Sequence, residues 1–218
     1  METYQQISVT ALLITILGIV LTYIINPDVE GWKHPVRSIF RVFTLAFIEQ
    51  KLSFAGAIRK LAYIVALLSF IILAITGFYP TLIKGEHISG YLIMIHATFG
   101  PVLAVCLAVL AVMWAGKSRF NNKDWPWFSR LVEKATLVKT ETDTTDNNTC
   151  LWQKIGFWLI IFLSLPLILS MVLSMLPYFG THWQELFLFI HRYTALVFAI
   201  AVLVHTHIII RAQIRQSV

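Results

Sequence analysis

The sequence predicts an all-α membrane protein: a four-helix transmembrane bundle with an additional N-terminal transmembrane helix and an interfacial amphipathic helix. The 218 residues are 58% hydrophobic and only 13% charged, with a mean hydropathy of +0.76, whereas a soluble domain carries about 25% charged residues. Several apolar stretches approach or exceed the roughly 20 residues that a helix needs to cross a bilayer. Lysine and arginine gather in the segments that would face one side of the membrane.

Five apolar stretches are long enough to be membrane-spanning helices, and they cover residues 7–25, 61–83, 88–115, 155–176 and 186–210. The second and third stretches are joined by a short connection, as are the fourth and fifth, so each pair should form a hairpin of neighbouring helices. The expected organisation is an extra helix over 1–26, a cytoplasmic connection over 27–57, and the bundle over 58–218 with a cytoplasmic loop over 116–151.

The distribution of basic residues predicts the orientation in the membrane. Fifteen of the seventeen lysines and arginines fall in residues 27–60, 116–154 and 211–215. Because lysine and arginine are enriched in cytoplasmic loops, we expect the N-terminus outside and the C-terminus in the cytoplasm. The first residues, METYQQ, carry no positive charge, so they do not resemble a cleaved signal peptide. Neither cysteine lies in a CxxC or CxxCH pattern, so the sequence predicts no iron–sulfur site and no covalent haem.

The two long connections differ in composition. Residues 36–54, VRSIFRVFTLAFIEQKLSF, mix charged and aromatic residues, which is the composition of a helix that lies in the membrane interface. This segment is either a scaffold docked on lipid, or the wall of a quinone entrance or a docking surface for a cytoplasmic partner. The other connection ends in ETDTTDNNT, residues 141–149, which lacks apolar residues and predicts a mobile loop.

The last apolar stretch carries three histidines, and histidine inside a spanning segment is a functional hypothesis by default. His191 and His205 are fourteen residues apart, which leaves them within about 40° of one helix face and about 21 Å apart along the axis. Two ligands on one face at that distance suit two stacked haems, one near each membrane surface. His207 points roughly 160° away from His191.

A fourth histidine, His96, matches His191 in depth. Each lies about 12 Å from the outer end of its helix, so the two side chains could ligate one iron between them, as in a bis-histidine haem b. Gly100 and nearby alanines would let a porphyrin approach the helix. The alternative is a hydrogen-bonded structural pair. Arg192 follows His191, and a haem propionate or a lipid phosphate would neutralise its charge.

No intramembrane histidine faces His205 from another helix, so the sequence shows only one histidine ligand for a second haem. Tyr63 is the residue nearest its depth, and His34 could reach it only if the first cytoplasmic segment folds back. Without a haem, His205, His207 and Tyr63 could line a quinone pocket, because imidazole and phenol groups bond and protonate carbonyl oxygens.

Five sequence pieces together resemble a known family. They are IHATFG around His96, KDWPWFSRLVE in the second cytoplasmic connection, QKIGFW, PYF, and FIHRYTALVFAIAVLVH through His191 and His205. In this order they are similar to the gamma subunit of membrane-bound formate dehydrogenases, a four-helix cytochrome b, and to the related hydrogenase cytochrome b subunits. The resemblance covers roughly residues 58–212, about 70% of the chain.

The resemblance implies a haem between His96 and His191 near the outer surface. It also implies a second haem near the inner surface that uses His205, with a menaquinone or ubiquinone beside it. In that family the other inner ligand is a histidine fourteen residues before a glycine. Counting back fourteen residues from Gly77 reaches Tyr63, so this ligand is absent. The first helix and the amphipathic connection are additions to the family's core.

These observations predict an electron-transfer subunit of an oxidoreductase complex in the inner membrane of a bacterium, rather than an enzyme acting alone. It would relay electrons between the quinone pool and an iron–sulfur or multihaem cytochrome c subunit at the outer face. The haem would carry the redox step and the chain would supply ligands and spacing. The alternative is a haem-free membrane anchor or assembly subunit of a respiratory complex. A nucleic-acid partner is not expected.

Overall fold

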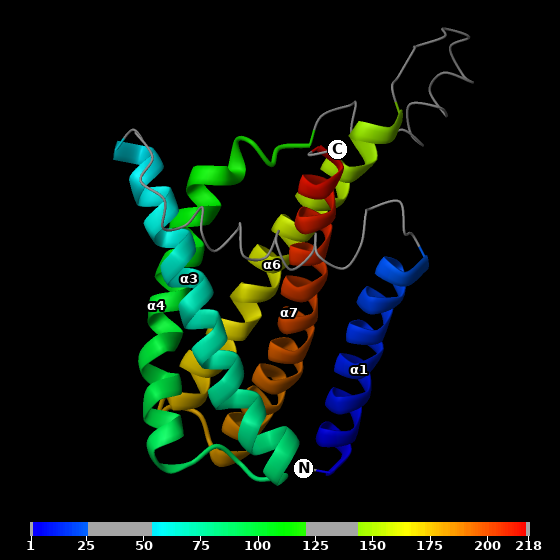
Figure 1. Cartoon of the computed structure of the whole chain (residues 1–218). Helices are drawn as coiled ribbons and strands as arrows, with labels where there is room; N and C mark the ends of the chain where they lie inside the picture. The colour runs from blue at the N-terminus through cyan, green and yellow to red at the C-terminus, as the bar shows by residue number, and fades with distance from the viewer. Residues whose placement is uncertain (1, 26–53, 121–143, 217–218) are drawn as a thin grey trace, which may run out of the picture.

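The computed structural model describes residues 2–25, 54–120 and 144–216, and all of its regular elements are helices. Five helices are long and apolar enough to cross a membrane, which confirms the predicted all-helical membrane fold. They are α1 (Glu2–Ile25), α3 (Phe54–Phe78), α4 (Gly90–Ala115), α6 (Thr144–Met175) and α7 (Thr181–Gln216), as Figure 1 shows.

Helix α3 continues directly into a short π-helix, η1 (Tyr79–Lys84). The chain leaves η1 at Gly85, whose φ of 69° is left-handed, a backbone conformation that glycine adopts without steric cost. A short turn then leads to α4, which begins at Gly90. The tight connection makes α3 and α4 antiparallel neighbours.

The helices extend further than the apolar stretches predict. Helix α6 begins at Thr144, eleven residues before the predicted start at residue 155, so the prediction of a loop over 141–149 is wrong from 144 onward. Hydropathy marks where a helix enters lipid, and a helix that is already nucleated continues through polar residues outside it. The predicted interfacial helix and the rest of the predicted mobile loop lie outside the described residues.

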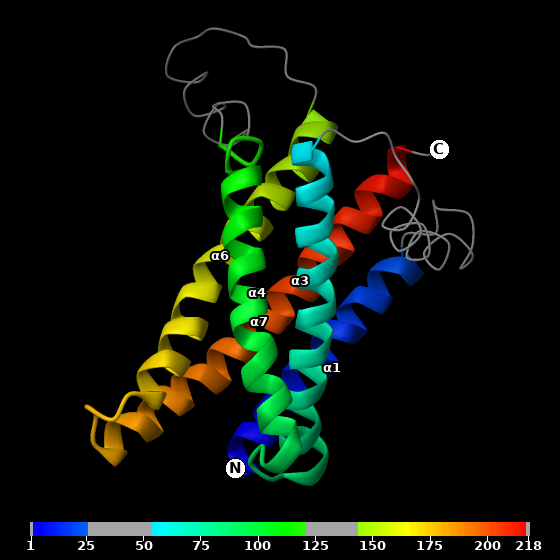
Figure 2. The ribbon, with the colours of Figure 1, turned by 90° about the vertical axis from the view of Figure 1, so that its left-hand side faces the viewer.

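The bundle consists of two tightly packed hairpins, α3–α4 and α6–α7, that contact each other much less extensively than their own helices do. Figure 2 shows α7 crossing α3 and α4 at an angle. Helix α1 lies outside the hairpins, against α7 and η1. The hairpins instead meet through side chains, among them the rings of Phe70 on α3 and Phe198 on α7.

The helices have the two kinds of surface expected of a membrane protein: closely packed helix–helix interfaces and apolar outer faces. Small residues, Ala62 and Ala66, let α3 approach Leu103 and Leu110 of α4 closely, as is common between membrane helices. Large apolar side chains such as Leu17 remain exposed on the outer faces, where a membrane would cover them.

The two ends of the bundle differ, and we name them by their connections. The turn end holds the start of α1, the α3–α4 connection and the α6–α7 connection (Figure 1). The tail end holds the end of α1, the start of α3, the end of α4, the start of α6 and the C-terminal end of α7.

Candidate functional site

The two hairpins meet at a pair of histidines in the turn-end half of the bundle. His96 comes from α4 and His191 from α7, and both rings are partly buried. Their ring centroids are 6.3 Å apart and the ring planes are inclined at 77°. The structure therefore brings together the two residues that matched in depth along the sequence.

The protonation state of His191 follows from its partner. Its Nδ1 lies 3.0 Å from the carbonyl oxygen of Leu167 on α6. A carbonyl oxygen only accepts, so Nδ1 must carry the proton and donate it. In a neutral imidazole the other nitrogen, Nε2, then keeps its lone pair for a metal.

His96 is held in the same way by α3. Its Nδ1 lies 2.9 Å from the hydroxyl oxygen of Thr76. That hydroxyl also lies 2.8 Å from the carbonyl oxygen of Ile72, so when it donates its one proton there it accepts the proton of His96 Nδ1. In that arrangement Nε2 of His96 is again left with a lone pair. Each histidine is thus tied to the other helix of its own hairpin.

Gly77 of α3 provides the space for the His96 ring. A Cβ atom at Gly77 would lie 3.1 Å from Cε1 of His96 and 3.7 Å from its Nδ1. The first distance is tighter than an ordinary van der Waals contact, so a side chain here would press on the ring. Thr76 and Gly77, which are consecutive residues, therefore fix the position of one imidazole.

The arrangement fits the axial ligands of a haem. Metal–imidazole bonds are about 2 Å long, so two imidazoles on opposite sides of one metal have ring centroids about 6 Å apart. In the described residues no group of three or more His, Cys, Asp or Glu side chains could hold a bare metal ion. Haem iron needs only two ligands from the protein because the porphyrin supplies the others. His96 and His191 are the residues that would hold it.

Arg192 reaches toward the turn end. One of its guanidinium nitrogens, Nη2, hydrogen-bonds Nδ1 of His87, in the connection between η1 and α4. Its carbonyl oxygen accepts a hydrogen bond of 3.1 Å from the hydroxyl of Tyr4 on α1. Arg192 thereby links α7 to both neighbouring elements, and its charge lies beside the histidine pair.

His205 has a different environment in the tail-end half. Its ring lies against Gly156 of α6, so closely that a Cβ there would overlap Nδ1 and lie 3.1 Å from Cγ. Nδ1 is buried and has no hydrogen-bond partner. In the part of the chain that the structure describes, no second histidine contacts it; His34 lies outside that part.

Aromatic side chains occupy the helix interfaces near this position. Tyr63 of α3 packs on Trp114 of α4, with ring centroids 6.2 Å apart, and Trp114 packs on Phe157 of α6 at 6.3 Å. Phe157 follows Gly156 directly. Tyr63, the residue that the sequence placed nearest to His205 in depth, is therefore packed in an aromatic cluster, and no hydrogen bond joins it to His205 among the described residues.

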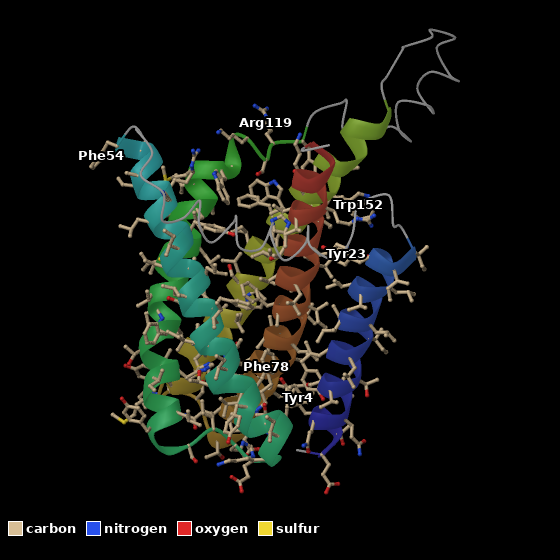
Figure 3. The ribbon with its side chains drawn as sticks, in the orientation of Figure 1. Tyr4, Tyr23, Phe54, Phe78, Arg119 and Trp152 are labelled. Atoms are coloured by element: carbon tan, nitrogen blue, oxygen red, sulfur yellow. The ribbon has the colours of Figure 1, made fainter. Side chains whose placement is uncertain are left out.

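His207 faces away from these residues and toward α1. Its Nε2 lies 3.1 Å from the hydroxyl of Thr22 and its Nδ1 lies 3.2 Å from the hydroxyl of Tyr23, on the side of α1 that Figure 3 shows turned toward α7. Both ring nitrogens have partners, so His207 holds α1 and does not line a pocket with His205 and Tyr63.

The sequence prediction overlooked three residues that shape these sites. Thr76 and the carbonyl of Leu167 orient the paired histidines, and Gly156 accommodates His205. Thr76 lies twenty residues from His96 and Leu167 twenty-four from His191, so a signal exists only once the hairpin register is known.

No curated protein and no solved structure matches the chain. The family model described as prokaryotic cytochrome b561 matches residues 57–218, which is 162 of the 218 residues and includes both histidines of the pair. The chain therefore belongs to the prokaryotic cytochrome b561 family.

Proposed function

We propose that this membrane haem-b electron-transfer protein relays electrons between a redox partner at the turn end of the bundle and the membrane quinone pool. The observation that carries the proposal is the His96–His191 pair, in which a hydrogen bond at Nδ1 holds each ring. Haem b, when bound, supplies the one-electron chemistry. The family match supports a haem b protein, and the proposal adds the partners and the route.

The chain keeps the site dry on its tail side. Phe70 of α3 and Phe198 of α7 touch across the two hairpins with ring centroids 6.0 Å apart. Phe198 is only 3% exposed and lies seven residues, or two helical turns, beyond His191. An apolar surrounding of this kind is one of the means by which a protein sets the reduction potential of a haem.

We place the redox partner at the turn end because the histidine pair lies in that half of the bundle. The similarity to formate dehydrogenase gamma subunits supports an iron–sulfur or multihaem cytochrome c subunit as this partner. The excess of lysine and arginine in the connections at the other end supports a turn end outside the cytoplasm, in the inner membrane of a bacterium. Arg192 and His87, which meet at the turn end, lie beside the proposed entry point.

We place the quinone in the tail-end half, beside His205. The buried Nδ1 of His205 has no partner, and an unpartnered buried nitrogen is costly unless a ligand or water bonds it. A protonated imidazole nitrogen can donate to a quinone carbonyl oxygen, and Nδ1, which lies against Gly156, would do so after the ring turns. An electron that crosses from the turn end to a quinone at the tail end stores about 2.3 kcal/mol per 100 mV of membrane potential.

The first test is a reduced-minus-oxidised absorption spectrum of the purified full-length protein, with haem quantified per chain. We expect the α band of a low-spin haem b. The absence of that band would leave a haem-free membrane anchor as the function.

The second test separates the quinone from the haem. A soluble quinol should reduce the haem of the wild-type protein, and His205→Ala should slow that reduction at least tenfold with the haem content unchanged. Thr206→Ala is the matched control, because its hydroxyl bonds only the carbonyl of Val202 and is exposed. If His205→Ala reduces at the wild-type rate, the quinone does not bind there.

A further inference from the structure

Thr76 is a buried polar residue on the face of α3 that packs against α4. It is 5% exposed, and a buried hydroxyl needs partners for both its proton and its lone pairs. Its oxygen lies 2.8 Å from the carbonyl of Ile72, 3.3 Å from the carbonyl of Leu73 and 2.9 Å from Nδ1 of His96. The two carbonyl oxygens can only accept, so when the proton of Thr76 points to one of them its oxygen accepts from Nδ1 of His96.

This contact distinguishes the two tautomers of His96. If His96 carried its proton on Nε2, the Thr76 hydroxyl would turn its proton from the carbonyls to the Nδ1 lone pair, and Nε2 could not bind a metal. With the proton on Nδ1, the hydroxyl accepts that proton while it donates to a carbonyl, and Nε2 keeps its lone pair. The hydroxyl of Thr76 can therefore hold His96 in the tautomer that binds a metal.

The same contact limits how far the ring can turn. Thr76 holds Nδ1, and the bare Cα of Gly77 lies next to Cε1. Both contacts come from one turn of α3, whereas His191 is held from α6 by a backbone carbonyl. The angle of 77° between the rings is therefore set by two independent tethers, and only the tether of His96 is a side chain.

We propose that Thr76 is a positioning residue for the haem, which fixes the tautomer and the ring plane of His96. The proposal rests on the proposed function, in which His96 and His191 are the axial ligands. Hydrogen bonds to metal-bound histidines fix the tautomer and ring orientation, and their loss typically lowers metal affinity by about 10–100-fold. The angle between two axial imidazole planes also governs the anisotropy of the electron paramagnetic resonance (EPR) signal of ferric haem, which gives a readout independent of turnover.

The experiment compares Thr76→Val, Thr76→Ala and Thr76→Ser in the full-length protein. Valine keeps a similar shape but removes the hydroxyl, and serine keeps the hydroxyl. We expect Thr76→Val and Thr76→Ala to lower haem affinity by about 10–100-fold, to shift the low-spin EPR signal and to change the midpoint potential. Thr76→Ser should match the wild type in all three.

Thr98→Val is the control for substituting valine for threonine near the site. Thr98 is on α4, two residues from His96, but its exposed hydroxyl bonds only the carbonyl of Met94. This variant should leave the EPR signal unchanged. The proposal is overturned if Thr76→Val and Thr76→Ala give the wild-type signal and potential, or if Thr76→Ser changes them as much as Thr76→Val does.

A separate variant distinguishes this inference from the proposed function. His96→Ala should lose the haem whatever Thr76 does. If His96→Ala keeps its haem, the ligand pair itself is wrong. If His96→Ala loses the haem while Thr76→Val changes nothing, only the role of Thr76 has failed. Should Thr76→Val not fold, Thr76→Ala and Thr76→Ser still decide between these outcomes.

Discussion

Helix α7 presents two histidines on one face, and they lie in very different surroundings. In the turn-end half, His191 donates to Leu167 and faces His96 at 6.3 Å. In the tail-end half, fourteen residues later, the buried Nδ1 of His205 has no partner. His191 and His205 are therefore regularly placed along α7, but the neighbouring helices give them different partners.

The difference shows that a haem site needs a contribution from a second hairpin. The α3–α4 hairpin supplies His96, Thr76 and Gly77 to the turn-end half. Near the tail end it supplies Tyr63 and Trp114, whose rings pack together. Two histidines on one face of α7 thus do not require two haems, and we expect one haem per chain.

The largest effect should come from removing the paired histidines. His96→Ala and His191→Ala should each abolish haem binding, because one axial ligand remains. His205→Ala should keep the full haem content, since the structure gives it no second ligand in the described residues. Haem per chain, measured on equal amounts of purified protein, decides this.

Two results would contradict the assignment of a single haem to the turn-end half. Two haems in the wild type, with one lost in His205→Ala, would mean that the tail-end half is also a haem site. The missing ligand would then have to come from residues such as His34. Unchanged haem in His191→Ala would remove the turn-end site instead.

The fold was largely predictable because lipid selects helices by length and hydropathy. Every predicted spanning stretch became a helix, since backbone groups in lipid must be satisfied internally. The helix ends were less predictable. Thr144 begins α6 and Gln216 ends α7 well outside the apolar stretches, because a helix can continue through polar residues in water.

The second-largest effect concerns Gly77 and Gly156, the glycines that lie against the rings of His96 and His205. Gly156→Ala should destabilise the protein by about 1–3 kcal/mol, the usual cost of overpacking, because its Cβ would overlap the His205 ring. Its haem content should stay unchanged. Gly77→Ala should be nearly neutral in stability, since alanine favours the helix by about 0.5–1 kcal/mol and the contact at 3.1 Å requires only a small shift.

Gly77→Ala should nevertheless move the midpoint potential, because the small shift falls on His96. Thermal unfolding in detergent and a redox titration measure the two quantities on the same samples. Gly18→Ala is the control, as nothing lies within 4 Å of a Cβ built there and α1 lies outside the two hairpins. If Gly156→Ala shifts the potential and Gly77→Ala does not, the haem lies in the tail-end half and not in the turn-end half.

The positions of the histidines were predictable from helical spacing, but their partners were not. A regular helix fixes the relative direction of His191, His205 and His207. Which neighbour each one meets depends on how the hairpins pack. Thr22 and Tyr23 meet His207 across more than 180 residues of sequence, and nothing in either segment marks that contact.

The smallest effects concern α1, which lies outside the residues that match the family. At its tail end α1 meets His207 through Thr22 and Tyr23. At its turn end Gln5 donates to the carbonyl of Leu82 in η1 at 2.8 Å, while the neighbouring Tyr4 bonds α7. Helix α1 therefore touches both hairpins at the turn end, beside the histidine pair.

Removing either contact alone should have a modest cost. Hydrogen bonds between membrane helices average about 0.6 kcal/mol, so Gln5→Ala should cost about that much and His207→Ala about twice as much. In a protein of this size each kcal/mol lowers the unfolding midpoint by about 2–4 °C. Gln6→Ala and Thr206→Ala are the matched controls, since both side chains are exposed.

The double variant Gln5→Ala/His207→Ala, which removes the contacts at both ends of α1, tests whether α1 acts as one unit. Gln5 and Thr22 are seventeen residues apart, about 26 Å along the helix, and substitutions so distant should add within about 0.5 kcal/mol. Additive losses, with an unchanged haem potential, would mean that the two ends of α1 are held separately. A larger combined loss would mean that α1 detaches as a rigid body, and a shifted potential would then show that its turn-end contacts help to set the spacing of His96 and His191.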